Sequence, residues 1–368
     1  MIRILHIVPD LCAASGIMSV VMNYYRFIDR SRIQFDFLYF EQKAADYEPE
    51  IRTLGGRIYR IEKPGLSMRF LNIADRFFAE HEGEYRVLHC HPIFASEVFG
   101  GAARRHGIRH VIQHSHSTKY SINRKAAIRN KCISLAGPLF ITDYMACSPR
   151  ASVLLGRRAA RSGRVFILNN AIDCKKYRFD MDARVRIRKQ HGIAEHTTVI
   201  GHTGRFAPEK NHLFLLDIFA AYQDKVPDSC LLLLGDGEQM SQVKDKARQL
   251  GVEDSVIFAG RRDNVPDYLS AMDFFVFPSV YEGLSLALVE AQCSGLYCFV
   301  SDTVAPETRV SGRYDTFSLN ESPTAIAERL QRAEPACDRY AFYDTLACDW
   351  LDIEKEARKL EQYYFALT

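Results

Sequence analysis

Two carboxylates and two cations in the second half of the sequence each lie close to a predicted junction between a strand and a helix. Glu282 and Glu290 are eight residues apart, and Arg205 and Lys210 are five residues apart. Cations beside the amino terminus of a helix favour an anion, because the helix adds free backbone N–H groups and the positive end of its dipole. Ionised carboxylates accept hydrogen bonds from hydroxyl groups. The cations and the helix starts therefore indicate a site suited to phosphate, with two carboxylates beside it.

The segment around the carboxylates reads as strand, turn and helix. The apolar run of residues 274–277 predicts a buried parallel strand, which Pro278 ends. Ser285 is in position to cap the next helix, and Gly295 is in position to end it. This order places the first carboxylate in the turn and the second within the helix, above the carboxyl edge of a sheet.

The two cations follow a second predicted strand, residues 198–202. The chain continues Thr-Gly-Arg-Phe-Ala-Pro-Glu-Lys-Asn, and we expect a helix to start at Asn211. Two cations and the N–H groups of a helix start are thus predicted to face the same phosphate site as the turn of the first segment.

Both segments resemble a known family of enzymes. The stretch FPSVYEGLSLALVEAQCSG resembles the E-x7-E donor-site motif of the retaining glycosyltransferases of the GT-B fold, in particular glycosyltransferase family 4, and residues 204–210 resemble the GR-x4-K diphosphate clamp of that family. The stretch MNYYRFIDRSRIQFDFLYF resembles the exopolysaccharide and capsule-synthesis branch. The resemblance covers almost the whole chain and is strongest over residues 198–302.

The resemblance implies a catalytic role for several residues. Arg205 and Lys210 would stabilise the negative charge that builds on the departing nucleotide diphosphate, without a metal ion. Glu282 would hold hydroxyls of the donor sugar and favour an oxocarbenium-like transition state, and Glu290 would bind the ribose hydroxyls. No pair of aspartates of the metal-binding DxD kind stands at a predicted strand end. We therefore expect neither a metal site nor a cofactor, and a nucleotide diphosphate sugar, with UDP favoured by its frequency in the family, as the donor.

The resemblance also adds a histidine and the backbone around the nucleotide. The family has a histidine facing the donor sugar at the end of a strand, which here begins at Val111; His116 aligns with it, and His114 is the alternative. In the amino-terminal loop the usual adjacent glycines are replaced by a Ser-Gly pair. The further nucleotide-sugar contacts that the resemblance implies are Gly16, Gly204, Arg261, Gly283, Leu284 and Ser285, with Arg261 placed to stack on the base.

Alternating short apolar strands and helical segments indicate an α/β fold with parallel sheets covered on both faces. The resemblance makes this the GT-B architecture, two Rossmann-like domains that face a cleft. Residues 169–173 resemble the family's NGID-type linker, with Ala171 in place of glycine. We therefore expect an acceptor-side domain over residues 1–172, a nucleotide-sugar-binding domain over residues 173–338, and a carboxyl-terminal helix over residues 339–368 that packs back toward the first domain.

The charge of the chain is distributed unevenly. Residues 101–190 contain 20 Lys or Arg against 4 Asp or Glu, a net of +16; because the whole chain carries +3, the remainder carries −13. Such a block indicates either a polyanionic partner or a solvated face. Because the resemblance implies a glycan or polyprenyl-diphosphate-linked acceptor, we expect peripheral contact with an anionic membrane through residues 120–131, and no nucleic acid.

The remaining composition limits the class of protein. No run of eighteen apolar residues occurs, so no transmembrane helix is expected, and the amino terminus reads as a first strand rather than a signal sequence. The ten cysteines are scattered without a C-x2-C pair, as in the reduced core of a cytoplasmic protein. His89-Cys90-His91 has ligand-like residue types, but we interpret it as the buried end of a strand.

Three other classes of protein fit parts of the sequence. A GT-B epimerase would share the fold and the nucleotide clamp, but no separate set of catalytic acids is evident. A nicotinamide dehydrogenase would need G-x-G-x-x-G before the first helix, where the chain has Ala-Ser-Gly-Ile-Met-Ser. A polyanion-binding protein without enzymatic activity would use the basic block but leave the cations and carboxylates of the second half unexplained.

Overall fold

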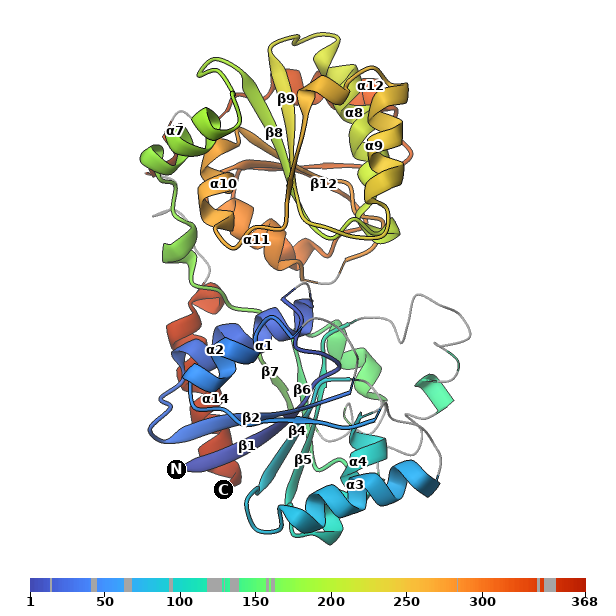
Figure 1. The fold of residues 1–368 in the computed structure, drawn as a ribbon, viewed down its shortest axis with the longest axis vertical. Coiled ribbons are helices and arrows are strands. Elements are labelled where there is room, and N and C mark those ends of the chain that lie inside the picture. Colours follow the sequence, from blue (N-terminus) through green and yellow to red (C-terminus); the bar gives the residue numbers. More distant parts are fainter. Residues whose placement is uncertain are drawn as a thin grey trace. The chain divides into compact units, whose positions relative to one another are not determined.

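The computed structural model describes residues 1–13, 15–40, 45–62, 68–92, 95–117, 128, 130–132, 139–156, 159, 163–282, 284–335, 338–340 and 349–368. The chain divides into two compact units. Unit 1 comprises Met1–Ile172 and Asp349–Thr368, and unit 2 comprises Asp173–Cys348. Each unit contains one sheet with helices on both faces (Figure 1).

The sheet of unit 1 has seven strands among the described residues, and all of its pairings are parallel. The strands are β1 (Ile2–Ile7), β2 (Ile33–Tyr39), β3 (Ile58–Arg60), β4 (Val87–Cys90), β5 (His110–Ser115), β6 (Asp143–Ala146) and β7 (Val165–Ile167). Their order across the sheet is β3-β2-β1-β4-β5-β6-β7. From β1 to β3 the chain adds strands toward one edge of the sheet, and from β4 onward it adds them toward the other edge, so the strand order reverses between β1 and β4. Open α/β sheets bind ligands at such a reversal point, outside the carboxyl ends of the strands.

One face of this sheet packs on two helices of the first half. Leu5, Leu88 and Val111 lie in one hydrophobic core with side chains of α3 (Met68–Glu80) and α4 (Ala95–Arg105). Because side chains alternate along a strand, the neighbouring residues of the same strands point to the opposite face.

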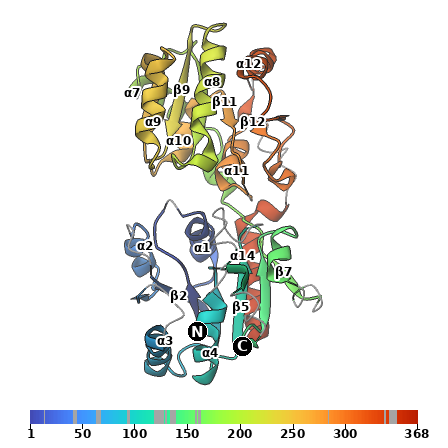
Figure 2. The same cartoon turned by 90° about the vertical axis from the view of Figure 1, so that its right-hand side faces the viewer.

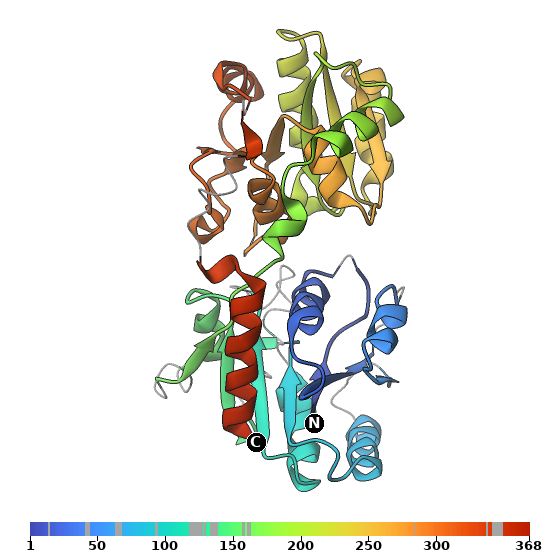
Figure 3. The ribbon, with the colours of Figure 1, turned by 90° about the vertical axis from the view of Figure 1, so that its left-hand side faces the viewer.

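That opposite face carries α1 (Gly16–Phe27) and α14 (Ile353–Leu367), which contact each other. In Figure 3, α14 is the long red helix beside the strands of unit 1. Tyr364 of α14 is fully buried and lies 2.6 Å from a ring nitrogen of His89 of β4. The last helix of the chain is therefore part of the first unit. The short elements among the described residues of unit 1 are α2 (Glu48–Thr53), the 3-10 turn η2 (Ala151–Leu155) and the 3-10 turn η7 (Asp349–Leu351).

The expected helix over residues 339–368 is interrupted. Arg339 is buried in unit 2, where its guanidinium donates to backbone carbonyl oxygens. Asp352 has an extended backbone, forms an isolated bridge with Ile172, and caps α14 by accepting from two backbone N–H groups of its first turn. The helix therefore starts at Ile353, because Asp352 is an N-cap residue.

The sheet of unit 2 has six strands among the described residues and is also parallel. The strands are β8 (Thr198–Thr203), β9 (Ser229–Leu234), β10 (Val256–Gly260), β11 (Phe274–Phe277), β12 (Tyr297–Ser301) and β13 (Tyr314–Phe317). Their order, β10-β9-β8-β11-β12-β13, places the reversal between β8 and β11. The sequence did not predict β13, because this edge strand is short and only partly apolar.

Two sets of helices cover this second sheet. One core contains side chains of α8 (His212–Gln223), α9 (Met240–Gln249) and α12 (Pro323–Arg332), and Figure 2 shows α8 and α9 side by side. The other core contains side chains of α7 (Met181–Gln190), α10 (Val265–Ala271) and α11 (Leu286–Cys293). The 3-10 turns of unit 2 are η3 (Cys174–Tyr177), η4 (Pro208–Lys210), η5 (Glu253–Ser255) and η6 (Pro306–Thr308). None of the helices among the described residues is long and apolar enough to span a membrane.

Candidate active site

The predicted cations and the first predicted carboxylate lie at the reversal point of unit 2. Arg205 and Lys210 are in the loop that follows β8, and Glu282 is in the loop that follows β11. β8 and β11 are neighbouring parallel strands, so their carboxyl ends meet at one edge of the sheet. Side chains more than 70 residues apart in sequence are thereby brought to the place where this type of sheet binds its ligands.

Two glycines bring the loops after β8 and β9 close together. A Cβ atom at Gly204 would lie 3.0 Å from Nε2 of His202, and one at Gly235 would lie 2.0 Å from the carbonyl oxygen of Gly204. Gly235, which follows β9, also has a φ of +134°. The loops after β8 and β9 therefore touch through backbone atoms, and this contact holds the loop that carries the cations.

Lys210 and Glu282 form an ion pair across the reversal point. Their side chains are 17% and 16% exposed, so the pair is largely shielded from water. The ammonium group also lies 5.1 Å from the ring centroid of Phe277, the last residue of β11. The hydroxyl of Ser279 is 3.4 Å from the same carboxylate oxygen. Lys210 is thus fixed in place, whereas the guanidinium of Arg205 is about half-exposed and pairs with Glu209 at 3.0 Å.

The helix that follows Glu282 is built as the sequence predicts. Ser285 occupies the N-cap position with an extended backbone, although its side chain makes no capping hydrogen bond within the described residues. α11 then runs from Leu286, and Gly295, with a φ of +72°, follows its end. Leu284 is half-buried, and Gly283 lies outside the described residues.

Glu290, inside α11, has a partner that the sequence did not reveal. The hydroxyl of Tyr177 donates to Oε1 of Glu290 at 2.8 Å. Burial raises the pKa of Glu290, while the Tyr177 hydrogen bond and the nearby Lys176 oppose that increase. Tyr177 belongs to η3, at the start of unit 2, and no local pattern connects it with a helix 113 residues later.

Arg261 lies at the other side of the sheet of unit 2. It is exposed and follows β10, the edge strand, at a point where Gly260 has a φ of +71°. Its neighbour Arg262 turns back and donates to the carbonyl of Ala259 at 2.8 Å. Arg261 therefore stands at the carboxyl edge of the sheet, but two strands away from the ion pair of Lys210.

The two predicted site residues of the first half lie in unit 1. Gly16 is the first residue of α1, beyond the loop that follows β1, and a Cβ atom there would have nothing within 4 Å. The fold itself therefore does not require glycine at this position. The loop is held by Asp10, which accepts from the backbone N–H of Cys12 at 3.1 Å.

His116 follows β5 and is half-buried. Its Nε2 lies 2.8 Å from Nδ1 of His91, and Nε2 of His91 lies 2.9 Å from Nδ1 of His6. Burial lowers the pKa of His116 to about 3. His114, the alternative candidate, is fully buried within β5 and lies 3.1 Å from His89. The interpretation of residues 89–91 as a buried strand end is confirmed, but the hydrogen bonds that connect it to other strands were not predicted.

The sequence pattern of the family described as Glycosyl transferases group 1 matches residues 197–333, which include both loops at the reversal point. The putative glycosyltransferase EpsF of Bacillus subtilis (strain 168) is 32% identical over 339 residues, which cover 91% of this chain and 88% of that protein. The chain belongs to the group 1 glycosyltransferases.

Two further comparisons place this glycosyltransferase among its relatives. The UDP-Gal:alpha-D-GlcNAc-diphosphoundecaprenol alpha-1,3-galactosyltransferase of Escherichia coli is 29% identical over 159 residues, 42% of this chain and 41% of that protein. The crystal structure of HepE (Alr3699) of Anabaena in complex with UDP-glucose matches with a TM-score of 0.80 at 17% identity, covering 100% of both chains. The expected GT-B class of fold, with two Rossmann-like parallel-sheet domains, is thereby confirmed.

The structure of this glycosyltransferase brings together only part of the predicted set. Arg205, Lys210 and Glu282 meet at the reversal point of unit 2, and Glu290 follows in α11. The residues that sequence reasoning missed are the hydrogen-bond partners of these side chains. They are Tyr177 beside Glu290, Ser279 beside Glu282, and His6 and His91 behind His116.

Proposed function

We propose that this glycosyltransferase is a retaining, metal-independent enzyme of family 4. It transfers a sugar from a UDP-sugar to a glycan or a lipid-linked acceptor in the synthesis of a surface polysaccharide. The observation that carries the proposal is the ion pair of Lys210 with Glu282 at the reversal point of unit 2, directly before the start of α11, with Arg205 in the same loop as Lys210.

The proposed donor site uses charges that already stand at this edge of the sheet. When the glycosidic bond to the donor breaks, negative charge develops on the diphosphate oxygen that leaves. Lys210 is fixed by its ion pair and its contact with Phe277, and Arg205 stands five residues before it. Preorganised cations stabilise such charge without reorganising during the reaction. This supports a leaving-group role for both side chains.

The two glutamates have different surroundings, which supports separate roles. Glu282 is paired with Lys210, so a diphosphate that approaches the lysine also approaches this carboxylate. We assign Glu282 to the hydroxyls of the donor sugar and to the positive character of the transition state. Glu290 instead accepts a hydrogen bond from Tyr177, and we assign it to the ribose hydroxyls.

The nature of the donor and acceptor is supported by relatives. HepE binds UDP-glucose, and the Escherichia coli enzyme is named for a UDP-galactose donor and a lipid diphosphate acceptor. We assign the acceptor to unit 1, where His116 and the basic residues of the first half lie. The resemblance of residues 22–40 to the exopolysaccharide branch is consistent with this assignment.

A donor panel tests the proposal. The purified protein is mixed with UDP-glucose, UDP-galactose, UDP-N-acetylglucosamine and GDP-mannose, each with and without EDTA, and its melting temperature and slow donor hydrolysis are measured. We expect at least one UDP-sugar to raise the melting temperature, because a ligand of the folded state stabilises it by mass action, and hydrolysis to continue in EDTA. The anomeric configuration of the first-released sugar, read by NMR, should match that of the donor. Inversion, or loss of turnover in EDTA, would refute the corresponding part of the proposal.

A further inference from the structure

Five histidines gather at the carboxyl end of the first sheet, at and beside its reversal point. In the parallel register His6 of β1 pairs with His89 of β4, so both side chains lie on the same face. Because side chains alternate along strands, residues two positions further along point to this face as well. The set is His6, His89, His91, His114 and His116. Neither the fold nor the proposed donor site in unit 2 requires such a concentration.

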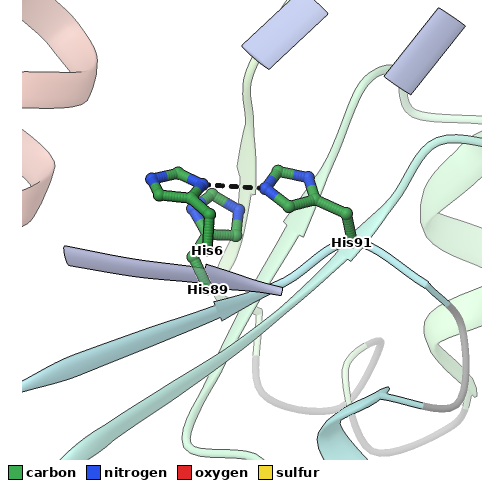
Figure 4. A group of neighbouring side chains, drawn as sticks. All are labelled: His6, His89 and His91. Atoms are coloured by element: carbon green, nitrogen blue, oxygen red, sulfur yellow. Dashed lines mark hydrogen bonds between the residues drawn. The ribbon is translucent and has the colours of Figure 1, made fainter. Parts of the chain in front are cut away.

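Three of these histidines form a row that ends at His116. Nδ1 of His6 lies 2.9 Å from Nε2 of His91, and Nδ1 of His91 lies 2.8 Å from Nε2 of His116. The ring centroids are 5.3 and 5.1 Å apart, and the planes of the first two rings differ by 15°. The rings therefore meet end to end, and Figure 4 shows this contact between His6 and His91.

The other two histidines form a second row that lies against the first. Nδ1 of His89 is 2.6 Å from the hydroxyl of Tyr364, and its Nε2 is 3.1 Å from Nδ1 of His114. The ring centroids of His89 and His91 are 4.4 Å apart, and the planes of the two rings differ by 15°. In Figure 4 the ring of His89 lies behind that of His6. The second row thus supports the first by stacking, without a hydrogen bond between them among the described residues.

The arrangement differs from that of a metal centre. Ring nitrogens of His6, His89 and His91 lie within 4.8 Å of one another, as do those of His91, His114 and His116. Two imidazoles on one tetrahedral zinc ion, however, hold their nitrogens about 3.4 Å apart, with both lone pairs directed at the ion. The nitrogens of the first row are closer, at 2.8 and 2.9 Å, and each points at its neighbour. These are distances of N–H···N hydrogen bonds.

A row of this kind has only two directions. Burial lowers the pKa of His6, His91 and His116, so each ring is neutral near neutral pH and carries one hydrogen. Either every Nδ1 carries the hydrogen and donates toward His116, or every Nε2 carries it and donates toward His6. The first direction leaves His116 with its hydrogen on Nδ1, and the second leaves Nδ1 of His116 with a bare lone pair.

The inner end of the row selects between the two directions. Nε2 of His6 is buried and has no hydrogen-bond partner within the described residues. The ring centroid of His6 lies 4.1 Å from that of Phe35 and 5.8 Å from that of Phe37. Orphaned buried N–H groups are rare in proteins, whereas under-satisfied acceptors are somewhat less so. The hydrogen of His6 therefore belongs on Nδ1, and the row runs from His6 to His116.

We propose that His6 and His91 are positioning residues that hold His116 as the Nδ1–H tautomer, so that His116 presents a hydrogen-bond donor rather than a base to a substrate bound at this edge of the first sheet. The tautomer follows from the row alone. That the group which accepts from His116 is an oxygen of a bound substrate rests on the proposed function.

Nitrogen NMR of protein labelled with ¹⁵N-histidine tests the tautomer without any reaction, because protonated and bare imidazole nitrogens have well-separated shifts. His116 is assigned as the signal that disappears in His116→Gln. We expect its Nδ1 to carry the hydrogen in the unmodified protein. His91→Phe, which keeps a buried ring but breaks both links, should give a mixture of tautomers. His91→Gln keeps one acceptor and one donor on a single side chain and should restore the Nδ1–H form.

His89→Phe is the matched control. His89 is buried like His91 and also makes two hydrogen bonds that phenylalanine would remove, but it belongs to the second row. It should lower the melting temperature about as much as His91→Phe and leave the tautomer of His116 unchanged. A hydrogen on Nε2 of His116 in the unmodified protein, or an unchanged tautomer in His91→Phe, would overturn the proposal. So would one equivalent of zinc that stays bound through dialysis and shifts the nitrogen signals of His6, His91 and His116.

A separate kinetic experiment tests whether the tautomer of His116 affects turnover. With the best donor of the panel, His91→Phe should lower kcat about tenfold, the scale of one hydrogen bond, with a smaller change in KM, and His91→Gln should recover most of the loss. An equal kcat in His91→Phe and the unmodified enzyme would refute the role of His116 as a hydrogen-bond donor to the substrate. If the expected tautomer is found and no donor is turned over, the proposed function fails and the positioning role stands.

Discussion

Lys210 and Glu282 form a shielded ion pair between the loops that follow β8 and β11. The pair joins the GR-x4-K and E-x7-E segments, which stand 72 residues apart in the sequence. A diphosphate that binds beside Lys210 must share the ammonium group with this carboxylate. The contact therefore links phosphate binding to the position of the carboxylate assigned to the donor sugar.

Removing either cation of the loop after β8 should impair transfer. Arg205→Ala and Lys210→Ala are each expected to lower kcat/KM roughly 100-fold or more, the scale for loss of a main transition-state stabiliser. The two should differ in stability. Arg205 is about half-exposed, so its loss should barely change the melting temperature, whereas loss of Lys210 leaves Glu282 without its cation and should lower it. Near-normal turnover in both variants would refute the assignment.

Substitutions of the two glutamates should have different effects on UDP binding. Glu290→Gln is expected to raise the Kd for free UDP about tenfold or more, because it removes a charged acceptor of hydrogen bonds. Glu282→Gln should leave UDP binding intact and damage transfer. Tyr177→Phe keeps the carboxylate of Glu290 and removes its partner, so it should weaken UDP binding by a smaller factor. Calorimetry that finds an equal loss of UDP affinity in both glutamate variants would contradict this division.

A partly buried glutamate of unit 1 should make stability depend on pH. Burial raises the pKa of Glu97 in α4 from its ordinary 4.5 to about 7, with a hydrogen bond from Ser96 opposing the increase. Between these values the folded protein binds more protons than the unfolded chain, so stability falls as the pH rises through this window. The expected loss is on the order of 1–3 kcal/mol. Denaturant titration at pH 4.5 and pH 8 measures it.

Glu97→Gln removes the titrating group and should flatten this part of the profile. Glu82→Gln, at an exposed position, controls for the loss of one negative charge. A profile of Glu97→Gln that keeps the full slope of the unmodified protein would show that another group causes it.

The basic segment of residues 120–131 should attach the enzyme to an anionic membrane. Most of the segment lies outside the described residues; within it, Ile128 is 66% exposed and Lys131 is exposed. Each Lys or Arg near an anionic leaflet contributes about 1 kcal/mol, so four such residues suffice for reversible binding. Flotation with liposomes should require anionic lipid, fall with salt, and drop when Arg124, Lys125, Arg129 and Lys131 are changed to Gln. Donor hydrolysis in solution should survive. Equal flotation on neutral and anionic vesicles, or flotation on neither, would remove the membrane contact.

The sequence by itself determined the elements that carry local signals. The run of residues 274–277 is a buried strand, Ser285 stands at a helix start and Gly295 follows the end of that helix. These features depend on the hydrophobicity and backbone freedom of neighbouring residues, so they are visible in a linear pattern. The same holds for Arg205, Lys210 and Glu282, which follow predicted strands, and for Glu290, which lies in the predicted helix.

The tertiary structure alone decided which of these side chains meet. Strand order is set by how whole sheets pack, and no local pattern states that β8 lies beside β11 or β1 beside β4. The ion pair of Lys210, the Tyr177 hydrogen bond and the row from His6 to His116 all depend on that order. His6 and His91 are 85 residues apart in the sequence, Lys210 and Glu282 are 72 apart, and Tyr177 and Glu290 are 113 apart. A contact at such a separation is fixed by the fold of the entire unit rather than by neighbouring residues.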